Sequence, residues 1–165
     1  MSRKSIKIQN KILADYKYKS KLLMKFINYV MKSGKKMTAE NIVYNALEVI
    51  KNIKGCNPII YFEQAITFIK PEFEIKSRRV GGSTYQIPIA IRNKRAIFLA
   101  MRWLLKYSYK RNEKNMALKL AYEIIDASNH KINTGSSRGT GQAIKKREDM
   151  HRMAEANKAF SHYKF

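Results

Sequence analysis

The sequence contains little cysteine, little proline and few acidic residues: one cysteine, three prolines and twelve Asp or Glu in 165 residues. The single cysteine, Cys56, excludes an intrachain disulfide framework and a cysteine metal cluster, and it fits a reducing compartment. No apolar run approaches the roughly 18 residues of a membrane-spanning helix. The basic N-terminal stretch has no apolar segment, so we expect no signal peptide.

Positive charge dominates the composition, with 34 Lys and Arg against 12 acidic residues and a formal net charge of +22. Because such self-repulsion destabilises a compact chain unless a polyanion neutralises it, nucleic acid is the leading partner. An anionic membrane surface is the second alternative. It requires an exposed helix with a wide apolar face, and the best amphipathic helix here is predicted to be core, so we expect no membrane partner. The length fits one domain over residues 1–165.

A two-stranded arm is predicted over residues 72–91. Two runs that alternate apolar and polar residues flank the pair Gly81 and Gly82, which is typical of a β-hairpin. Glycine is needed at the tip because tight hairpin turns require positive φ. Pro88 cannot donate to a ladder and therefore confines its strand to an edge. Three cations lie beside the tip, namely Lys76, Arg78 and Arg79.

Three helices are predicted before the hairpin. Ser20 is a typical N-cap for the first helix, and Gly34 is expected to terminate it. The second helix has the clearest apolar stripe, and Gly55 ends it. Asn57 and Pro58 open the third helix as its cap and its first helical residue. The stripe of the second helix consists of Ala39, Ile42, Val43, Ala46, Leu47, Ile50 and Ile53.

Three more helices are predicted after the hairpin. Asn93 is a candidate cap for the fourth helix, and the fifth begins near Lys114. The last runs from about Gln142 to Phe160 and has a thin apolar face that includes Met153. The predicted fold class is therefore mainly α: a bundle of six helices, with the two-stranded hairpin projecting between the third and fourth helices.

The fourth helix has a second stripe in which cations alternate with aromatic residues. Such a stripe suits contacts with phosphates and bases of RNA. It is equally compatible with a solvated face whose long side chains shield the core. The residues of the stripe are Arg95, Phe98, Arg102, Lys106 and Tyr109.

Two segments lie outside the predicted helices and hairpin, and one basic cluster stands at the start of the last helix. Residues 1–19 hold many lysines and few apolar anchors, which indicates an extended basic arm. Residues 128–142 are rich in Gly, Ser and Asn, which predicts a flexible loop. Lys145, Lys146 and Arg147 stand at the start of the last helix, where the helix dipole disfavours cations. An external anion would offset that cost, so their position favours a binding role.

Nothing in the sequence requires catalysis, a metal or another cofactor. His151 and Glu155 are four residues apart and could form half of a metal site, but an ordinary surface pair is the preferred interpretation. The other histidines have no acid–nucleophile pattern around them. Gly81 and Gly82 lack the strand–loop–helix context of a nucleotide site. We therefore expect no enzymatic activity.

Five motifs, in this order, resemble ribosomal protein seven of the small subunit. They are residues 26–28 (FIN), 34–36 (GKK), 76–88 (KSRRVGGSTYQIP), 102–105 (RWLL) and 145–160 (KKREDMHRMAEANKAF). The hairpin and C-terminal motifs are long and specific, and the resemblance covers nearly the whole chain. The sequence departs from the family in two places: the loop at 128–142 is longer than usual, and the chain ends in Phe165 where Trp is common.

The resemblance implies a structural constituent of the ribosome, in the cytoplasm of a bacterium or in a plastid or mitochondrion. Proteins of this family bind small-subunit rRNA as primary binders and nucleate assembly of the head, the 3′ major domain. They lie near the exit site, where the hairpin approaches tRNA and the mRNA path. The implied protein neighbours are small-subunit proteins nine, eleven, thirteen and nineteen, and no homo-oligomer is expected.

The family pattern and the basic residues together predict two sets of site residues. The tRNA- and mRNA-side set at the arm consists of Arg78, Arg79, Gly81, Gly82, Ser83 and Thr84. The rRNA-binding set consists of Arg3, Lys4, Lys7, Lys25, Lys35, Lys36, Lys76, Arg78, Arg79, Arg95, Arg102, Lys106, Arg111, Lys114, Lys145, Lys146 and Arg147.

The alternative function is that of a DNA-architectural protein, because a basic β-arm on a helical body can also wrap a minor groove. Such proteins usually dimerise and insert an apolar wedge from the arm tip. Here the tip is Gly81 and Gly82, and the chain has no dimer seam. The sequence therefore favours the ribosomal hypothesis.

Overall fold

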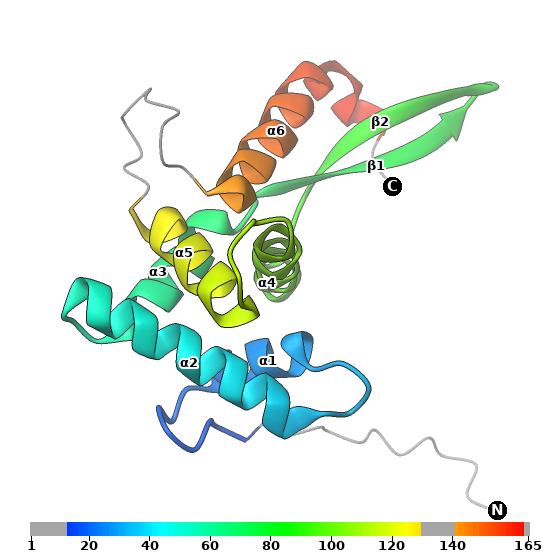
Figure 1. Cartoon of the computed structure of the whole chain (residues 1–165). Helices are drawn as coiled ribbons and strands as arrows, with labels where there is room; N and C mark the ends of the chain where they lie inside the picture. The colour runs from blue at the N-terminus through cyan, green and yellow to red at the C-terminus, as the bar shows by residue number, and fades with distance from the viewer. Residues whose placement is uncertain (1–12, 130–140, 164–165) are drawn as a thin grey trace, which may run out of the picture.

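The computed structural model describes residues 13–129 and 141–163 of the chain. These residues form six α-helices, one 3-10 helix and an antiparallel hairpin between the third and fourth helices (Figure 1). The elements are α1 (Lys21–Val30), α2 (Lys36–Lys54), α3 (Pro58–Ile69), β1 (Phe73–Val80), β2 (Ser83–Ala90), α4 (Asn93–Tyr109), α5 (Met116–Ser128), α6 (Gln142–Ala156) and η1 (Lys158–Tyr163). The predicted fold class is confirmed. None of the described helices is long and apolar enough to cross a membrane.

The predicted capping residues act at the ends of three helices. The Ser20 hydroxyl accepts a hydrogen bond from the Leu23 amide at 3.3 Å at the start of α1. The Asn57 side chain accepts one from the Ile59 amide at 3.2 Å at the start of α3. Gly55 follows α2 with φ of 66°. Each residue satisfies helix-end groups that have no partner within the helix.

Other helix boundaries differ from the prediction. α1 ends before Gly34, which lies in the connecting turn with φ of 74°. Asn93 is the first residue of α4 rather than its cap, and α5 begins at Met116 rather than near Lys114. The last helix does not continue as an α-helix to Phe160 but turns into the 3-10 helix η1. Helix ends fray, so shifts of one or two residues are ordinary, whereas η1 redirects the chain.

The core lies among the five helices α1 to α5 and the first turn of α6. At its centre, the rings of Phe26 in α1 and Phe62 in α3 lie 5.2 Å apart. Most of the predicted α2 stripe is buried, although Ile42 is only half-buried. Ile53 and Met153 were predicted to face inward and are 50% and 37% exposed, respectively. Both lie in the last turn of their helices.

The predicted N-terminal arm is not extended over the part that the structure describes. There the chain makes a turn against α2, and the Asp15 carboxylate is almost fully buried. The Tyr44 hydroxyl donates to this carboxylate at 2.6 Å, and Lys17 pairs with Glu48 at 2.7 Å. Burial raises the pKa of Tyr44, and the bond to Asp15 adds to this shift. The buried Asp15 carboxylate thus anchors to α2 a segment that its composition alone predicted to be an extended basic arm.

The hairpin has the predicted turn. Val80 pairs with Ser83, which leaves Gly81 and Gly82 as a two-residue loop. Their φ angles are 57° and 88°. Two consecutive residues with positive φ define a turn whose twist matches that of the flanking strands.

The base of the hairpin is fastened to two helices. The Glu74 carboxylate on β1 is 8% exposed, and the Arg95 Nε on α4 donates to it at 2.8 Å. On α6, the His151 Nε2 accepts a hydrogen bond from the Glu72 amide at 3.2 Å. The His151 ring also meets the Phe73 ring edge-on, with centroids 6.3 Å apart. The arm therefore leaves the body at a defined angle.

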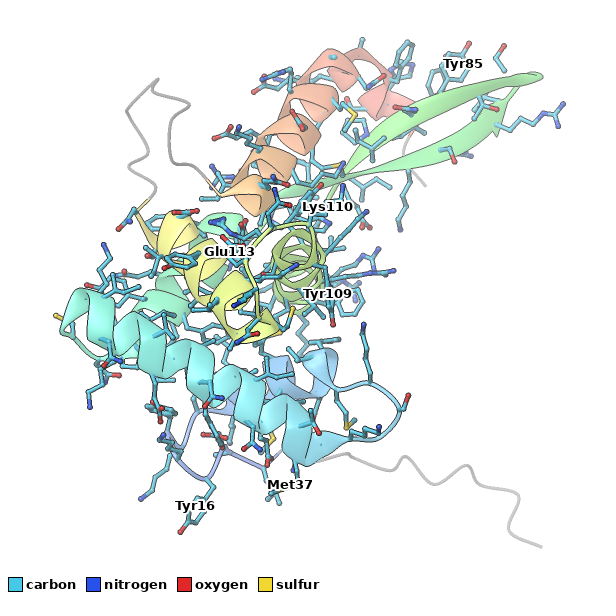
Figure 2. The ribbon with its side chains drawn as sticks, in the orientation of Figure 1. Tyr16, Met37, Tyr85, Tyr109, Lys110 and Glu113 are labelled. Atoms are coloured by element: carbon cyan, nitrogen blue, oxygen red, sulfur yellow. The ribbon has the colours of Figure 1, made fainter. Side chains whose placement is uncertain are left out.

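The middle of the hairpin packs against η1, which the sequence did not predict. Tyr85 on β2 lies 5.1 Å from the Phe160 ring and 5.6 Å from the Tyr163 ring. The Arg78 guanidinium donates to the backbone carbonyl of Tyr163 at 2.8 Å. In Figure 1 the chain turns back beside the hairpin after α6, and Figure 2 shows Tyr85 on that side. Only the part of the arm from Arg79 to the tip extends beyond this contact.

Replacing both Gly81 and Gly82 by Val should disorder the arm tip without unfolding the body. A β-branched residue with positive φ is a strong conformational outlier, and the helical core is remote from the tip. We expect far-UV circular dichroism to keep its helical signal while amide exchange accelerates in the tip-proximal strand residues. The control is Gly81→Asn, since Asn tolerates this turn position. Loss of most of the helical signal would contradict the prediction.

Candidate nucleic-acid interface

The exposed side of α1 carries polar and aromatic residues at helical spacing. Its opposite side is buried through Leu23, Phe26, Ile27 and Val30. Residues three and four apart lie on the same face of a helix, so the exposed residues form one row. This row consists of Lys25, Asn28, Tyr29 and Lys32, the last just beyond the helix end.

α4 presents a similar row, which contains the stripe predicted from the sequence. Its opposite side is buried through Ala96, Ala100 and Leu104. The cations of the stripe are exposed and Phe98 is half-buried. At 100° per residue the exposed members span about a third of the helix circumference. They are Lys94, Arg95, Phe98, Arg102, Lys106 and Tyr109.

The two rows lie side by side and make one surface, here called the α1–α4 face. The Tyr29 and Phe98 rings meet edge-on with centroids 5.5 Å apart. Farther along, the Lys32 ammonium lies 4.3 Å from the centre of the Tyr109 ring. At 1.5 Å per residue, the α4 row from Lys94 to Tyr109 is about 22 Å long. Tyr109 is labelled at the end of α4 in Figure 2.

The α1–α4 face is positively charged along its length. Neither α1 nor α4 contains an acidic residue. The face continues into the turn after α1, where Lys32, Lys35, Tyr109 and Met116 line a hollow of about 160 Å³. The next lysine, Lys36, is 3.5 Å from its i+4 neighbour on α2, Glu40. A long basic surface with exposed rings can bind phosphates and stack bases.

At the arm, the predicted site residues differ in their solvent exposure and in their contacts within the protein. Arg79, the two glycines and the residues that follow them are exposed. Lys76 lies 3.5 Å from the buried Glu74 carboxylate. Arg78 is half-buried and bonded to the Tyr163 carbonyl. The tip can therefore meet a partner, whereas Arg78 also holds the arm to the C-terminal segment.

Arg111 was predicted to bind RNA, but its guanidinium is engaged inside the protein. Its side chain is 17% exposed and surrounded by three carboxylates. It bonds Glu123 at 2.9 Å, Asp126 at 2.8 Å and Glu113 at 3.2 Å. Burial raises the pKa of Asp126, although the neighbouring guanidinium acts in the opposite direction. Arg111 is thus placed to connect the α4–α5 turn with α5.

At the start of α6, where the sequence favoured an external anion, a carboxylate of the chain binds a backbone amide. The Glu123 Oε1, fully buried on α5, accepts a hydrogen bond from the Ala143 amide at 2.9 Å. A carboxylate at a helix N-terminus satisfies free amides and opposes the helix dipole. A Cβ on Gly141 would lie 2.8 Å from that oxygen, so a larger residue there would displace the carboxylate.

The three cations at this end of α6 differ in exposure. Lys145 is exposed, and Lys146 is half-buried. Arg147 is also half-buried, and it donates to the Phe68 carbonyl at the end of α3. Arg147 therefore fastens α6 to α3, which is a role inside the fold.

Other predicted site residues lie elsewhere. Arg3, Lys4 and Lys7 are outside the described residues, as is most of the predicted loop at 128–142. Lys114 is exposed just before α5. Within the described ranges, no group of three His, Cys, Asp or Glu residues could hold a metal ion.

Four residues of the α1–α4 face were absent both from the predicted rRNA-binding set and from the predicted stripe of the fourth helix. For all of them except Lys94, which is on α4, the signal was present along α1 as an i, i+3, i+4, i+7 row of polar and aromatic residues opposite the apolar stripe. What the sequence could not supply was the contact that brings this row to the α4 row. The four residues are Asn28, Tyr29, Lys32 and Lys94.

Comparison with known proteins gives one consistent result. The family model of ribosomal protein S7p/S5e matches residues 2–158. Small ribosomal subunit protein uS7 from Ectopseudomonas mendocina is 53% identical over 165 residues, which is 100% of both chains. Proteins of the same name from Pseudomonas entomophila and Pseudomonas fluorescens also show 53% identity with full coverage of both chains.

Proposed function

The chain belongs to the ribosomal protein S7p/S5e family, and from this premise we propose that it binds small-subunit rRNA through the α1–α4 face. As a member of this family it is a structural constituent of the small ribosomal subunit and takes part in translation. One observation supports the proposed interface: two adjacent helices present cations and aromatic rings on one surface and contain no acidic residue.

The α1–α4 face is suited to fixing the position of RNA. Its cations stand on helices whose other sides are buried in the core, so their backbones are held rigidly. Contacts from such cations to phosphates set register and orientation without reading sequence. The exposed rings add contacts that unpaired bases can use, and RNA offers such bases in loops and bulges. The face therefore combines general affinity with a preference for irregular RNA.

The family resemblance extends the proposal to the place of the protein in the subunit. We propose that it is a primary rRNA binder that nucleates assembly of the head, with the hairpin tip directed to exit-site tRNA and the mRNA path. The contacts that fasten the arm to α4, α6 and η1 support a separate role for the tip, because they hold an exposed tip away from the body. The proposed protein neighbours are small-subunit proteins nine, eleven, thirteen and nineteen.

Binding of the isolated protein to small-subunit rRNA should depend steeply on salt. If the interface neutralises six to ten phosphates, affinity should fall about a thousandfold or more between about 50 and 200 mM monovalent salt, because bound counterions are released. Filter binding across a salt series measures the slope. Arg102→Ala should reduce the slope by about one. The control is Lys51→Ala, which changes an exposed lysine on α2.

Two outcomes would count against the proposed interface. Affinity that hardly changes with salt would contradict an electrostatic interface altogether. Equal slopes for wild type and Arg102→Ala would instead place the interface away from α4.

A further inference from the structure

We propose that the hollow between α1 and α4 is a binding pocket for one unstacked RNA base, with lysines at its rim holding the adjoining phosphates. This inference rests on the proposed rRNA binding and assigns that interface a specific contact. The hollow has a volume of about 290 Å³ and is lined by Lys25, Asn28, Tyr29, Lys94, Ile97, Phe98 and Met101.

The size and the floor of the pocket fit a single base with its sugar. Ligand pockets usually measure about 300 to 1,000 Å³, so this one lies near the lower limit and suits one small planar group. Met101 is fully buried and Ile97 is half-buried, and together they provide an apolar floor. An apolar floor favours a group that gains by leaving water, as an unstacked base does.

Two aromatic rings supply the stacking surface. Tyr29 on α1 is 39% exposed and Phe98 on α4 is half-buried, and their rings meet edge-on at 5.5 Å. Neither side chain belongs to the core cluster or to the residues packed against it. Large rings held at the surface, beside cations and outside the core, are typical of platforms for nucleic-acid bases.

Polar groups around the rings match the rest of a nucleotide. Lys25 and Lys94 are exposed on opposite helices, one on each side of the hollow. They can therefore meet phosphates on both sides of an inserted base. The Asn28 amide offers a donor and an acceptor, the pair of groups that the edge of a base requires. None of the described residues that line the pocket is acidic, so a polyanion can approach them without repulsion.

The first test measures binding of small-subunit rRNA by the double variant Tyr29→Ala and Phe98→Ala. We expect affinity to fall about tenfold, the usual cost of losing one stacked base. The slope of affinity against salt should stay unchanged, because the rings release no counterions. Phe98→Tyr should bind as wild type, since a phenol ring stacks as well. The control is Tyr16→Ala, which removes a ring that is 95% exposed and lies beyond α2 in Figure 2.

The complementary variant changes the rim. Lys25→Ala with Lys94→Ala should reduce the salt slope by about two, because two phosphate contacts are lost. Circular dichroism and thermal melting of every variant check the fold, and the position of both rings outside the core predicts nearly native values. Wild-type rRNA binding by the double variant Tyr29→Ala and Phe98→Ala would overturn the proposal.

The second test locates the base directly. Small-subunit rRNA transcribed with 4-thiouridine is bound to the wild-type protein, irradiated and digested, and the crosslinked peptides are identified by mass spectrometry. We expect crosslinks at Tyr29 or Phe98 and their loss after substitution. Crosslinks confined to other elements would overturn the pocket while leaving rRNA binding intact. Failure of the wild-type chain to bind rRNA at all would instead refute the proposed function.

Discussion

Glu123→Ala is expected to lower the free energy of unfolding by about 3–5 kcal/mol, the usual cost of removing one partner from a buried ion pair. The Glu123 carboxylate is fully buried and makes two contacts at once, with Arg111 at 2.9 Å and with the Ala143 amide at 2.9 Å. Its removal leaves a buried N–H without an acceptor, takes one carboxylate from a half-buried guanidinium and opens a cavity. Each of these changes destabilises the folded chain.

Two further variants separate the effects of charge and shape. Glu123→Gln keeps the acceptor for Ala143 but loses the charge, so we expect a smaller loss than with alanine. Glu48→Gln is the matched control, because Glu48 also pairs with a cation but its side chain is 56% exposed. Exposed pairs contribute at most about 1 kcal/mol. Urea denaturation of the three variants gives the comparison. Equal losses for Glu123→Ala and Glu48→Gln would mean that α6 does not depend on the buried carboxylate.

The sequence predicted the features whose causes are local. The hairpin follows from alternation beside Gly81 and Gly82, whose positive φ the turn requires. The caps of α1 and α3 follow from Ser20 and Asn57, which bond amides two or three residues away. Each of these signals involves residues only a few positions apart, so the sequence alone is enough to identify it.

Polar groups paired over long separations could not be predicted. Asp15 and Tyr44 are 29 residues apart, and Arg78 bonds a carbonyl 85 residues away. In each case the sequence identifies a charged residue but not its partner, because burial and pairing depend on the tertiary fold. This is why Asp15 was placed in an extended arm and why Arg111 was placed on the RNA surface.

The sequence predicted only part of the candidate site, because the rest depends on contacts between residues that are far apart in the sequence. The α4 stripe was identified, but its two interpretations, a binding surface and a solvated face, could not be separated from one helix. The contact of Tyr29 with Phe98 places a second basic row beside the first, which supports the interpretation as a binding surface. The structure thereby extends a stripe on one helix to a surface with a pocket.

The last prediction concerns the division of labour between body and arm, and it requires two variants. The body variant changes Lys94, Arg102 and Lys106 to Ala, all of them exposed on α4. Arg95 is left intact, because its Nε holds the buried Glu74 at the base of the arm. At about 1.5 kcal/mol or more per hydrogen bond to a charged group, three lost contacts should weaken rRNA binding by about a thousandfold or more.

The arm variant shortens each strand of the hairpin by two residues. The deleted residues lie between the turn and the cross-strand pair of Arg78 with Tyr85. The variant removes two cross-strand pairs, Arg79 with Thr84 and Val80 with Ser83, and keeps the glycine turn. The register below the turn is preserved, because side-chain alternation repeats every two residues. The contacts of Arg78 and Tyr85 with η1 remain available. The variant therefore shortens the arm only in the part beyond the contact with η1.

We expect the body variant to be depleted from the small-subunit peak of a lysate gradient, because the rigid α1–α4 face would no longer hold rRNA. The arm variant should sediment with the small subunit as wild type does, since the proposed anchoring face is untouched. In the same cells, a frameshift reporter should show altered reading-frame maintenance with the arm variant, because this variant lacks most of the tip that we propose contacts exit-site tRNA. The division would be falsified if tip removal blocked incorporation as severely as the loss of three α4 cations, since the arm would then be an assembly element.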